Sequence, residues 1–205
     1  MSKFNFSSSL KLTGFDLRNN RRQIIGWVIA VFSIMFMYMI LFPSMQDMAK
    51  MKMEAMPKEF LQLFDMENMN DLANFTGYFG MVFNLILIAM SIFAASFAAN
   101  LIYREEKLKT IEFLYSLEVS RTEIYVSKLI TAFLACLAVL LSAAVSTAVC
   151  GFINGGETFV FADFLQIVKV SGFTVFFFMA VSLMVAGCTA KLGVAGGGSM
   201  VDLFS

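Results

Sequence analysis

The sequence predicts an all-α fold, a polytopic bundle of membrane-spanning helices with a cytosolic N-terminus. Of the 205 residues, 59% are hydrophobic and only 15% are charged. Soluble domains carry about 45–50% apolar and about 25% charged residues, so this composition is typical of a membrane protein. Four long apolar runs, with no charged residue in their interiors, alternate with segments that hold the charges. Each run is a candidate transmembrane helix.

The four runs have the length that a bilayer crossing requires. The first covers residues 24–42 and is followed by Pro43, which ends it. At 1.5 Å per residue it is about 28 Å long, close to the roughly 30 Å hydrocarbon core. The others cover about residues 75–103, 129–152 and 170–190. Spans without charge argue against an ion pathway or proton relay built on carboxylates.

Two segments flanking the first run are predicted to form helices of their own. Residues 1–23 place Leu10, Leu12, Phe15 and Leu17 among basic residues, as in an amphipathic helix at the inner membrane interface. The Met-rich residues 43–74 predict one or two short helices whose apolar side faces lipid or the bundle.

Small and polar residues inside the spans indicate packing surfaces. Ser91, Ala95 and Ala99 share one face of the second span, and the third span has a similar face of small residues at Ala138, Ser142 and Ser146. Asn84 and Asn100 are expected to face protein or a cavity. Each could make a structural hydrogen bond or contact a substrate.

The distribution of basic residues predicts the orientation. Eleven of the fifteen Lys and Arg residues lie in residues 1–23, in residues 104–128 or at Lys191. The positive-inside rule therefore places the N-terminus and residues 104–128 in the cytosol. Residues 43–74 and 153–169 then face outward.

Several kinds of chemistry lack the residues they need. The chain has no histidine, and its three cysteines, Cys136, Cys150 and Cys188, lie in or at the ends of apolar runs, so we expect small buried hydrophobic side chains. No phosphate-binding G-x-x-x-x-G-K-[ST] loop is present. No basic face indicates nucleic acid, and an intramembrane enzyme would lack a visible base. The chain is therefore predicted to have no catalytic site, no metal and no cofactor.

Residues 104–128, REEKLKTIEFLYSLEVSRTEIYVSK, hold ten of the thirty charged residues. Apolar residues recur at helical spacing over 105–118 and predict a short amphipathic helix. Ser120 and Glu123 form a capping box, which predicts that the third span begins at Ser120 or Arg121. The segment is therefore predicted to be helix, turn, helix, with Arg121 exposed at the turn.

This segment resembles the cytosolic loop between the second and third spans of ABC transporter permeases of the type-2 exporter class. Their pattern is roughly E-E-x-x-G-T-x-E-x-L-x-S-x-P-V-S-R-x-E-I-x-x-x-K. Lys109 and Glu118 stand where that pattern has Gly and Pro. The matching residues are Glu105, Glu106, Thr110, Glu112, Leu114, Ser116, Val119, Ser120, Arg121, Glu123, Ile124 and Lys128.

The resemblance implies a permease subunit of an ATP-dependent exporter in a bacterial plasma membrane. Its loop would carry a coupling helix that docks on a separate cytosolic ATPase, which uses the ATP, and a second permease subunit would complete a homo- or heterodimer. The docking residues would be Glu105, Glu106, Thr110, Glu112, Leu114, Tyr115, Ser116, Ser120 and Arg121.

The resemblance also implies six spans, of which four are visible. Residues 192–205 are therefore interpreted as the start of a fifth span in a C-terminally truncated chain. The transported substrate is not indicated. The alternative function is a non-transporting membrane scaffold or accessory subunit, which would need no ATPase partner.

Overall fold

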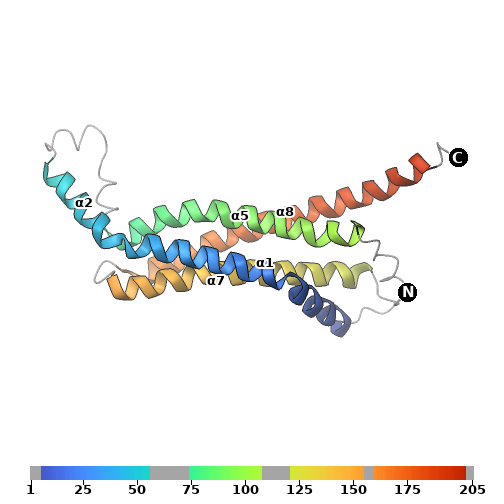
Figure 1. The fold of residues 1–205 in the computed structure, drawn as a ribbon, viewed down its shortest axis with the longest axis horizontal. Helices are drawn as coiled ribbons and strands as arrows, with labels where there is room; N and C mark the ends of the chain where they lie inside the picture. Colours follow the sequence, from blue (N-terminus) through green and yellow to red (C-terminus); the bar gives the residue numbers. More distant parts are fainter. Residues whose placement is uncertain (1–5, 56–73, 108–120, 155–158, 202–205) are drawn as a thin grey trace. The chain divides into compact units, whose positions relative to one another are not determined.

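The chain folds into helices alone over the residues that the computed structural model describes, which are 6–55, 74–107, 121–154 and 159–201. Of these residues 97% are helical, none lies in a strand, and four helices are long and apolar enough to cross a membrane. The predicted all-α fold with four candidate spans is confirmed, and Figure 1 shows the helices along the chain. The orientation in the membrane stays a prediction.

Five helices make up this part of the chain. The short helix α2 carries the first part of the Met-rich segment, as predicted, and its Met45, Met48 and Met51 side chains are exposed. The four long helices carry the candidate spans. Their bounds are Phe6–Ile40 for α1, Phe42–Ala55 for α2, Phe75–Lys107 for α5, Arg121–Asn154 for α7 and Phe161–Val201 for α8.

The predicted interfacial helix and the first span are parts of one helix, since α1 runs without a break from Phe6 to Ile40. Leu41 separates α1 from α2, and its amide N–H donates to the Tyr38 carbonyl at 3.2 Å. Pro43 lies in the first turn of α2, where its missing N–H would have no partner inside the helix. The helix therefore breaks close to Pro43, while the candidate span extends beyond it, from Ser9 to Met48.

Helix α7 begins at Arg121, as the capping box predicts, although Ser120 lies outside the described residues. Helix α5 continues past its predicted end at residue 103 to Lys107. The remainder of the predicted amphipathic helix, residues 108–118, also lies outside the described residues.

The fourth span differs from its prediction at both ends. Helix α8 begins at Phe161 rather than near residue 170, and its candidate span, Phe161–Cys188, contains Asp163 and Lys169. The predicted bounds of about 170–190 contain no charged residue, and the two charges lie before that range, in the first turns of α8. The apolar residues before position 170 continue the helix, and both charged side chains are exposed, so neither interrupts it.

Residues 192–201 continue α8. The interpretation of residues 192–205 as the start of a fifth span stays a prediction. Gly196, Gly197 and Gly198 do not end the helix. Each glycine lowers helix stability by about 1 kcal/mol relative to alanine, but none removes a backbone N–H as proline would.

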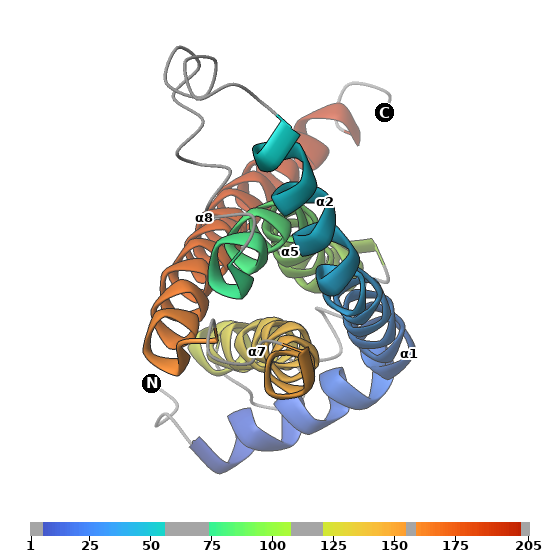
Figure 2. The same ribbon diagram turned by 90° about the vertical axis from the view of Figure 1, so that its left-hand side faces the viewer.

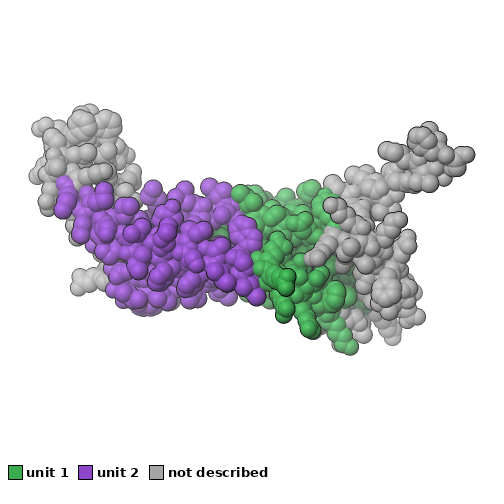
Figure 3. All heavy atoms as spheres, in the orientation of Figure 1, with its two compact units in different colours: residues 1–24, 90–137, 174–205 green, residues 25–89, 138–173 purple. Residues whose placement is uncertain are grey.

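The chain divides into two compact units, coloured in Figure 3. Unit 1 comprises residues 1–24, 90–137 and 174–205, and unit 2 comprises residues 25–89 and 138–173. All four long helices contribute residues to both units.

Aromatic side chains form the core of unit 2 where α2, α5 and α8 begin. Phe42 and Phe75 meet edge to face with ring centroids 5.1 Å apart, and Phe79 lies 5.4 Å from Phe164. The Tyr78 hydroxyl donates to the Tyr38 carbonyl of α1 at 2.8 Å. Edge-to-face and tilted contacts of this kind stabilise packing beyond the area they bury. They hold the starts of α2, α5 and α8 together.

Small residues allow close helix packing in both units, as the sequence predicts. Ser142 and Ser146 are buried on α7, and the Ser146 hydroxyl donates to the Phe32 carbonyl of α1 at 3.2 Å in unit 2. The Ser182 hydroxyl of α8 donates to the Ala95 carbonyl of α5 at 2.6 Å in unit 1. A hydroxyl can reach a neighbouring backbone carbonyl only where small residues let the helices approach.

Gly151 gives a testable case of such packing. A Cβ atom built on Gly151 would lie 2.7 Å from Cε2 of the Phe159 ring, closer than real contacts allow. We therefore expect Gly151→Ala to lower the melting temperature in detergent by several degrees, because the aromatic cluster must shift. Gly26→Ala is the matched control in the same unit, since nothing lies within 4 Å of its Cβ position. It should leave stability unchanged or raise it. Equal effects of the two substitutions would contradict this assignment.

Candidate functional site

The predicted docking residues lie on the segment that joins α5 to α7. Glu105 and Glu106 belong to the last turn of α5, and Arg121 is the first residue of α7, but their side chains are not described. The role of this segment in docking therefore stays a prediction. The other predicted docking residues lie outside the described residues: Thr110, Glu112, Leu114, Tyr115, Ser116 and Ser120.

The C-terminal side of this segment enters a buried polar region of unit 1. Four side chains in the first turns of α7 are buried although they are polar or charged: Glu123, Ser127, Lys128 and Thr131. Three more, on the first turns of α1, are buried as well: Ser9, Thr13 and Asp16. We call these seven residues the α1–α7 polar cluster. Figure 2 shows the beginning of α1 lying alongside α7.

Helical spacing explains why α1 presents a polar face to α7. Ser9, Thr13 and Asp16 are separated by four and three residues, so they lie on one side of the helix. The Thr13 hydroxyl lies 2.9 Å from the Ser9 carbonyl of its own helix and 3.4 Å from the Ser127 carbonyl of α7. The polar face of α1 is therefore in direct contact with the backbone of α7.

An ion pair lies in the centre of this cluster. The Lys128 ammonium donates to both carboxylate oxygens of Asp16, at 2.9 and 2.8 Å. The side chains retain only 6% and 11% of their exposure. A charge buried to this extent needs an opposite charge and hydrogen bonds, because water no longer stabilises it. The pair therefore fixes the start of α1 to the second turn of α7.

Sequence analysis found the residues but missed the pair. Sequence analysis counted Lys128 among the charges that set orientation and assigned no contact to Asp16. The helical spacing of Ser9, Thr13 and Asp16 could have indicated a polar helix face. The apolar residues of the same segment drew the prediction to an apolar face instead. In the structure Leu10 and Phe15 are 49% and 67% exposed, so the apolar side of this helix faces away from the protein.

A second polar region lies in unit 2, between α5 and α8. Asn84 lines a pocket there, as expected for a polar residue in a span. Asn84 and Asn100 are both exposed in the single chain, so the expectation for Asn100 stays a prediction. The pocket also contains Asp163 and Gln166, which sequence analysis placed in an outer loop.

Within the described residues, no group of three or more His, Cys, Asp or Glu side chains is arranged to hold a metal ion. Cys136 and Cys150 are free and buried, as predicted for small hydrophobic side chains. Cys188 is free but exposed, so the prediction is wrong for this residue.

The chain matches one known protein family over nearly its whole length. The family is described as multidrug efflux system permease Rv1217c, C-terminal domain, and the match covers residues 11–202. No curated protein and no solved structure matches the chain significantly. The match includes all four candidate spans except for the first two residues of the first one, and both partners of the Asp16–Lys128 pair. The chain therefore belongs to this family of efflux permeases and is a multi-pass membrane protein.

Proposed function

We propose that the chain is the membrane-spanning subunit of an ATP-binding cassette exporter of the type-2 class that removes drug-like molecules from the cell. The observation that carries the proposal is the family match over residues 11–202, whose name describes a multidrug efflux permease. Four helices long and apolar enough to cross a membrane support it. The chain itself would hydrolyse no ATP, because it lacks a phosphate-binding loop.

The energy for transport would come from a separate cytosolic ATPase docked on residues 104–128. Charged and apolar residues alternate in this segment, which suits a helix that sits in a groove of a partner protein. Leu114 and Tyr115 would fill the groove, while Glu106, Glu112 and Arg121 would make polar contacts at its edge. A second permease subunit would complete the transport path.

The Asp16–Lys128 pair gives this docking segment a mechanical connection to the bundle. Lys128 lies seven residues after Arg121, and its ammonium holds the Asp16 carboxylate of α1 at 2.8 Å. A displacement of the docking segment would therefore move α7 and the start of α1 together. A loosely attached loop would absorb the same displacement without moving either helix.

Co-purification tests the proposal directly. The full chain and its candidate ATPase are co-expressed, extracted in mild detergent and purified through a tag on the permease. We expect Arg121→Glu combined with Leu114→Asp to abolish ATPase recovery, because the changes reverse a charge and place a carboxylate in an apolar groove. Loss of at least 90% of the bound ATPase is the expected result.

The matched control makes the same two kinds of change on the predicted outer side. Lys169→Glu combined with Leu165→Asp alters exposed positions of α8 and should leave ATPase recovery unchanged. Undiminished binding and ATPase stimulation by the Arg121 and Leu114 variant would refute docking at this segment. If the wild-type chain recovers no ATPase at all, the scaffold function is favoured instead.

A further inference from the structure

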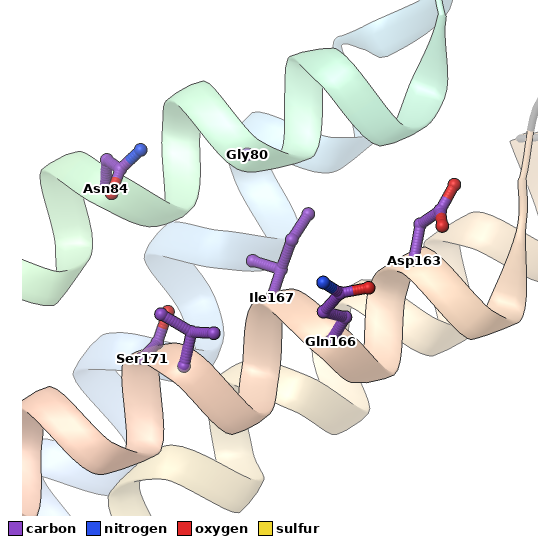
Figure 4. Close-up of a pocket in the computed structure, with 7 residues that line it drawn as sticks. Gly80, Asn84, Asp163, Gln166, Ile167 and Ser171 are labelled. Atoms are coloured by element: carbon purple, nitrogen blue, oxygen red, sulfur yellow. The ribbon is translucent and has the colours of Figure 1, made fainter.

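The pocket between α5 and α8 is a polar site within an otherwise apolar surface. It is open to the surface and has a volume of about 360 Å³, in the range of sites that bind drug-sized molecules. Gly80 and Asn84 contribute from α5, and Asp163, Gln166, Ile167, Val170 and Ser171 from α8. Figure 4 shows Ile167 directed toward Gly80 and Asp163 directed toward α5. All of these residues belong to unit 2.

Gly80 keeps the pocket open. Its Cβ position would be 3.8 Å from Cδ1 of Ile167, so the two helices approach each other across this residue. A larger side chain at position 80 would extend into the space between α5 and α8. The lining thus combines the apolar side chains of Ile167 and Val170 with the polar side chains of Asn84, Asp163 and Gln166.

The Asp163 carboxylate is the only formal charge among the lining residues. Within the described part of the chain it makes no hydrogen bond or ion pair, and the same is true of Asn84 and Gln166. The Asp163 side chain is exposed beside the apolar Ile167 side chain, so a cation bound there would keep part of its contact with solvent. The Gln166 amide, one turn after Asp163 on α8, can accept a hydrogen bond from such a cation through its carbonyl oxygen.

We propose that this pocket binds amphipathic organic monocations, with the cationic centre at Asp163 and the hydrocarbon part against Ile167 and Val170. One carboxylate and an apolar wall suit a soft organic cation, whereas Mg²⁺ or Ca²⁺ would require about six or more oxygen ligands. Binding of the cation requires only the pocket and does not depend on the proposed export function. The role of the pocket as a substrate subsite rests on the proposed export function.

The test measures binding of two probes to the purified full chain in phosphatidylcholine nanodiscs without any ATPase. Tetraphenylphosphonium is a lipophilic cation, and triphenylphosphine oxide carries similar phenyl rings without net charge. Empty nanodiscs give the partition of each probe into lipid. We expect Asp163→Asn to weaken tetraphenylphosphonium binding about five- to tenfold and to leave triphenylphosphine oxide binding unchanged.

Two further variants separate the pocket from general surface charge. Asp47→Asn removes an exposed carboxylate of α2 that does not line the pocket, so it should have no effect on either probe. Gly80→Leu should weaken both probes because it fills the shared space. Unchanged cation binding in Asp163→Asn, or an equal loss in Asp47→Asn, would overturn the proposal.

Failure of the docking proposal can be distinguished from failure of the pocket proposal. If the chain recruits no ATPase, the nanodisc measurement still reports binding at the pocket. If binding is absent while the ATPase still docks and is stimulated, the pocket is not a cation site and the export function stands.

Discussion

Lys128→Met is expected to destabilise the folded chain by about 3–5 kcal/mol, because it leaves the Asp16 carboxylate buried without its partner. The side chain of methionine has nearly the same length as that of lysine, so packing changes little and the effect reports the lost charge. An SDS titration followed by circular dichroism measures the change in unfolding free energy. If the chain serves an ATPase, stimulation should fall as well, since α1 would no longer follow α7.

Removing both charges provides the control for this prediction. The double variant Asp16→Asn and Lys128→Met should recover most of the lost stability, because a buried ion pair contributes little over neutral groups of similar shape. Lys11→Met, which removes an exposed lysine of α1, should change stability by less than about 0.5 kcal/mol. A Lys128→Met chain as stable as wild type would contradict the ion pair.

Phe79→Ala is expected to have the second large effect, a loss of about 3 kcal/mol. Phe79 has no exposed surface, and its ring centroid lies 5.0 Å from that of Phe83 and 5.4 Å from that of Phe164. Truncation leaves a cavity in the aromatic core, for which soluble proteins lose about 3–5 kcal/mol. The lower end applies here, because helix association in lipid depends on packing rather than on exclusion of water.

Phe173→Ala makes the same chemical change on the surface of the same unit. Its side chain is 76% exposed, so no cavity forms within the chain and the unfolding free energy should stay within about 0.5 kcal/mol of wild type. The same SDS titration compares the two variants. A Phe79→Ala chain no less stable than the Phe173→Ala chain would show that the aromatic cluster does not hold α5 to α8.

Hydropathy and breaker residues were sufficient to predict the long helices, because a bilayer crossing demands a long apolar run whatever the tertiary contacts are. Pro43 marked the end of α1, and the Ser120–Glu123 box marked the start of α7. The start of α8 was missed because Asp163 and Lys169 interrupt the apolar run in sequence. On the helix both side chains are exposed, and Asp163 lines the open pocket between α5 and α8, so neither ends the helix.

The polar contacts were harder to predict, because they join residues far apart in the chain. Asp16 and Lys128 are separated by 112 positions, and no local sequence pattern predicts that they pair. Asn84 could be expected to face a cavity, but its neighbour Asp163 comes from another helix. The prediction of the docking residues rests on a local sequence resemblance, and the co-purification experiment tests it.

The lengths of the long helices set a condition on the surrounding lipid. With 33 to 41 residues each, they contain about 50–62 Å of helix, whereas the hydrocarbon core of a bilayer is about 30 Å thick. Each helix must therefore tilt or extend beyond the hydrocarbon core, and only the part of its apolar stretch that exceeds the core costs free energy, a fraction of a kcal/mol per ångström. Acyl-chain length thus becomes a physical variable that sorts this chain among membranes of different thickness, independently of any ligand or partner.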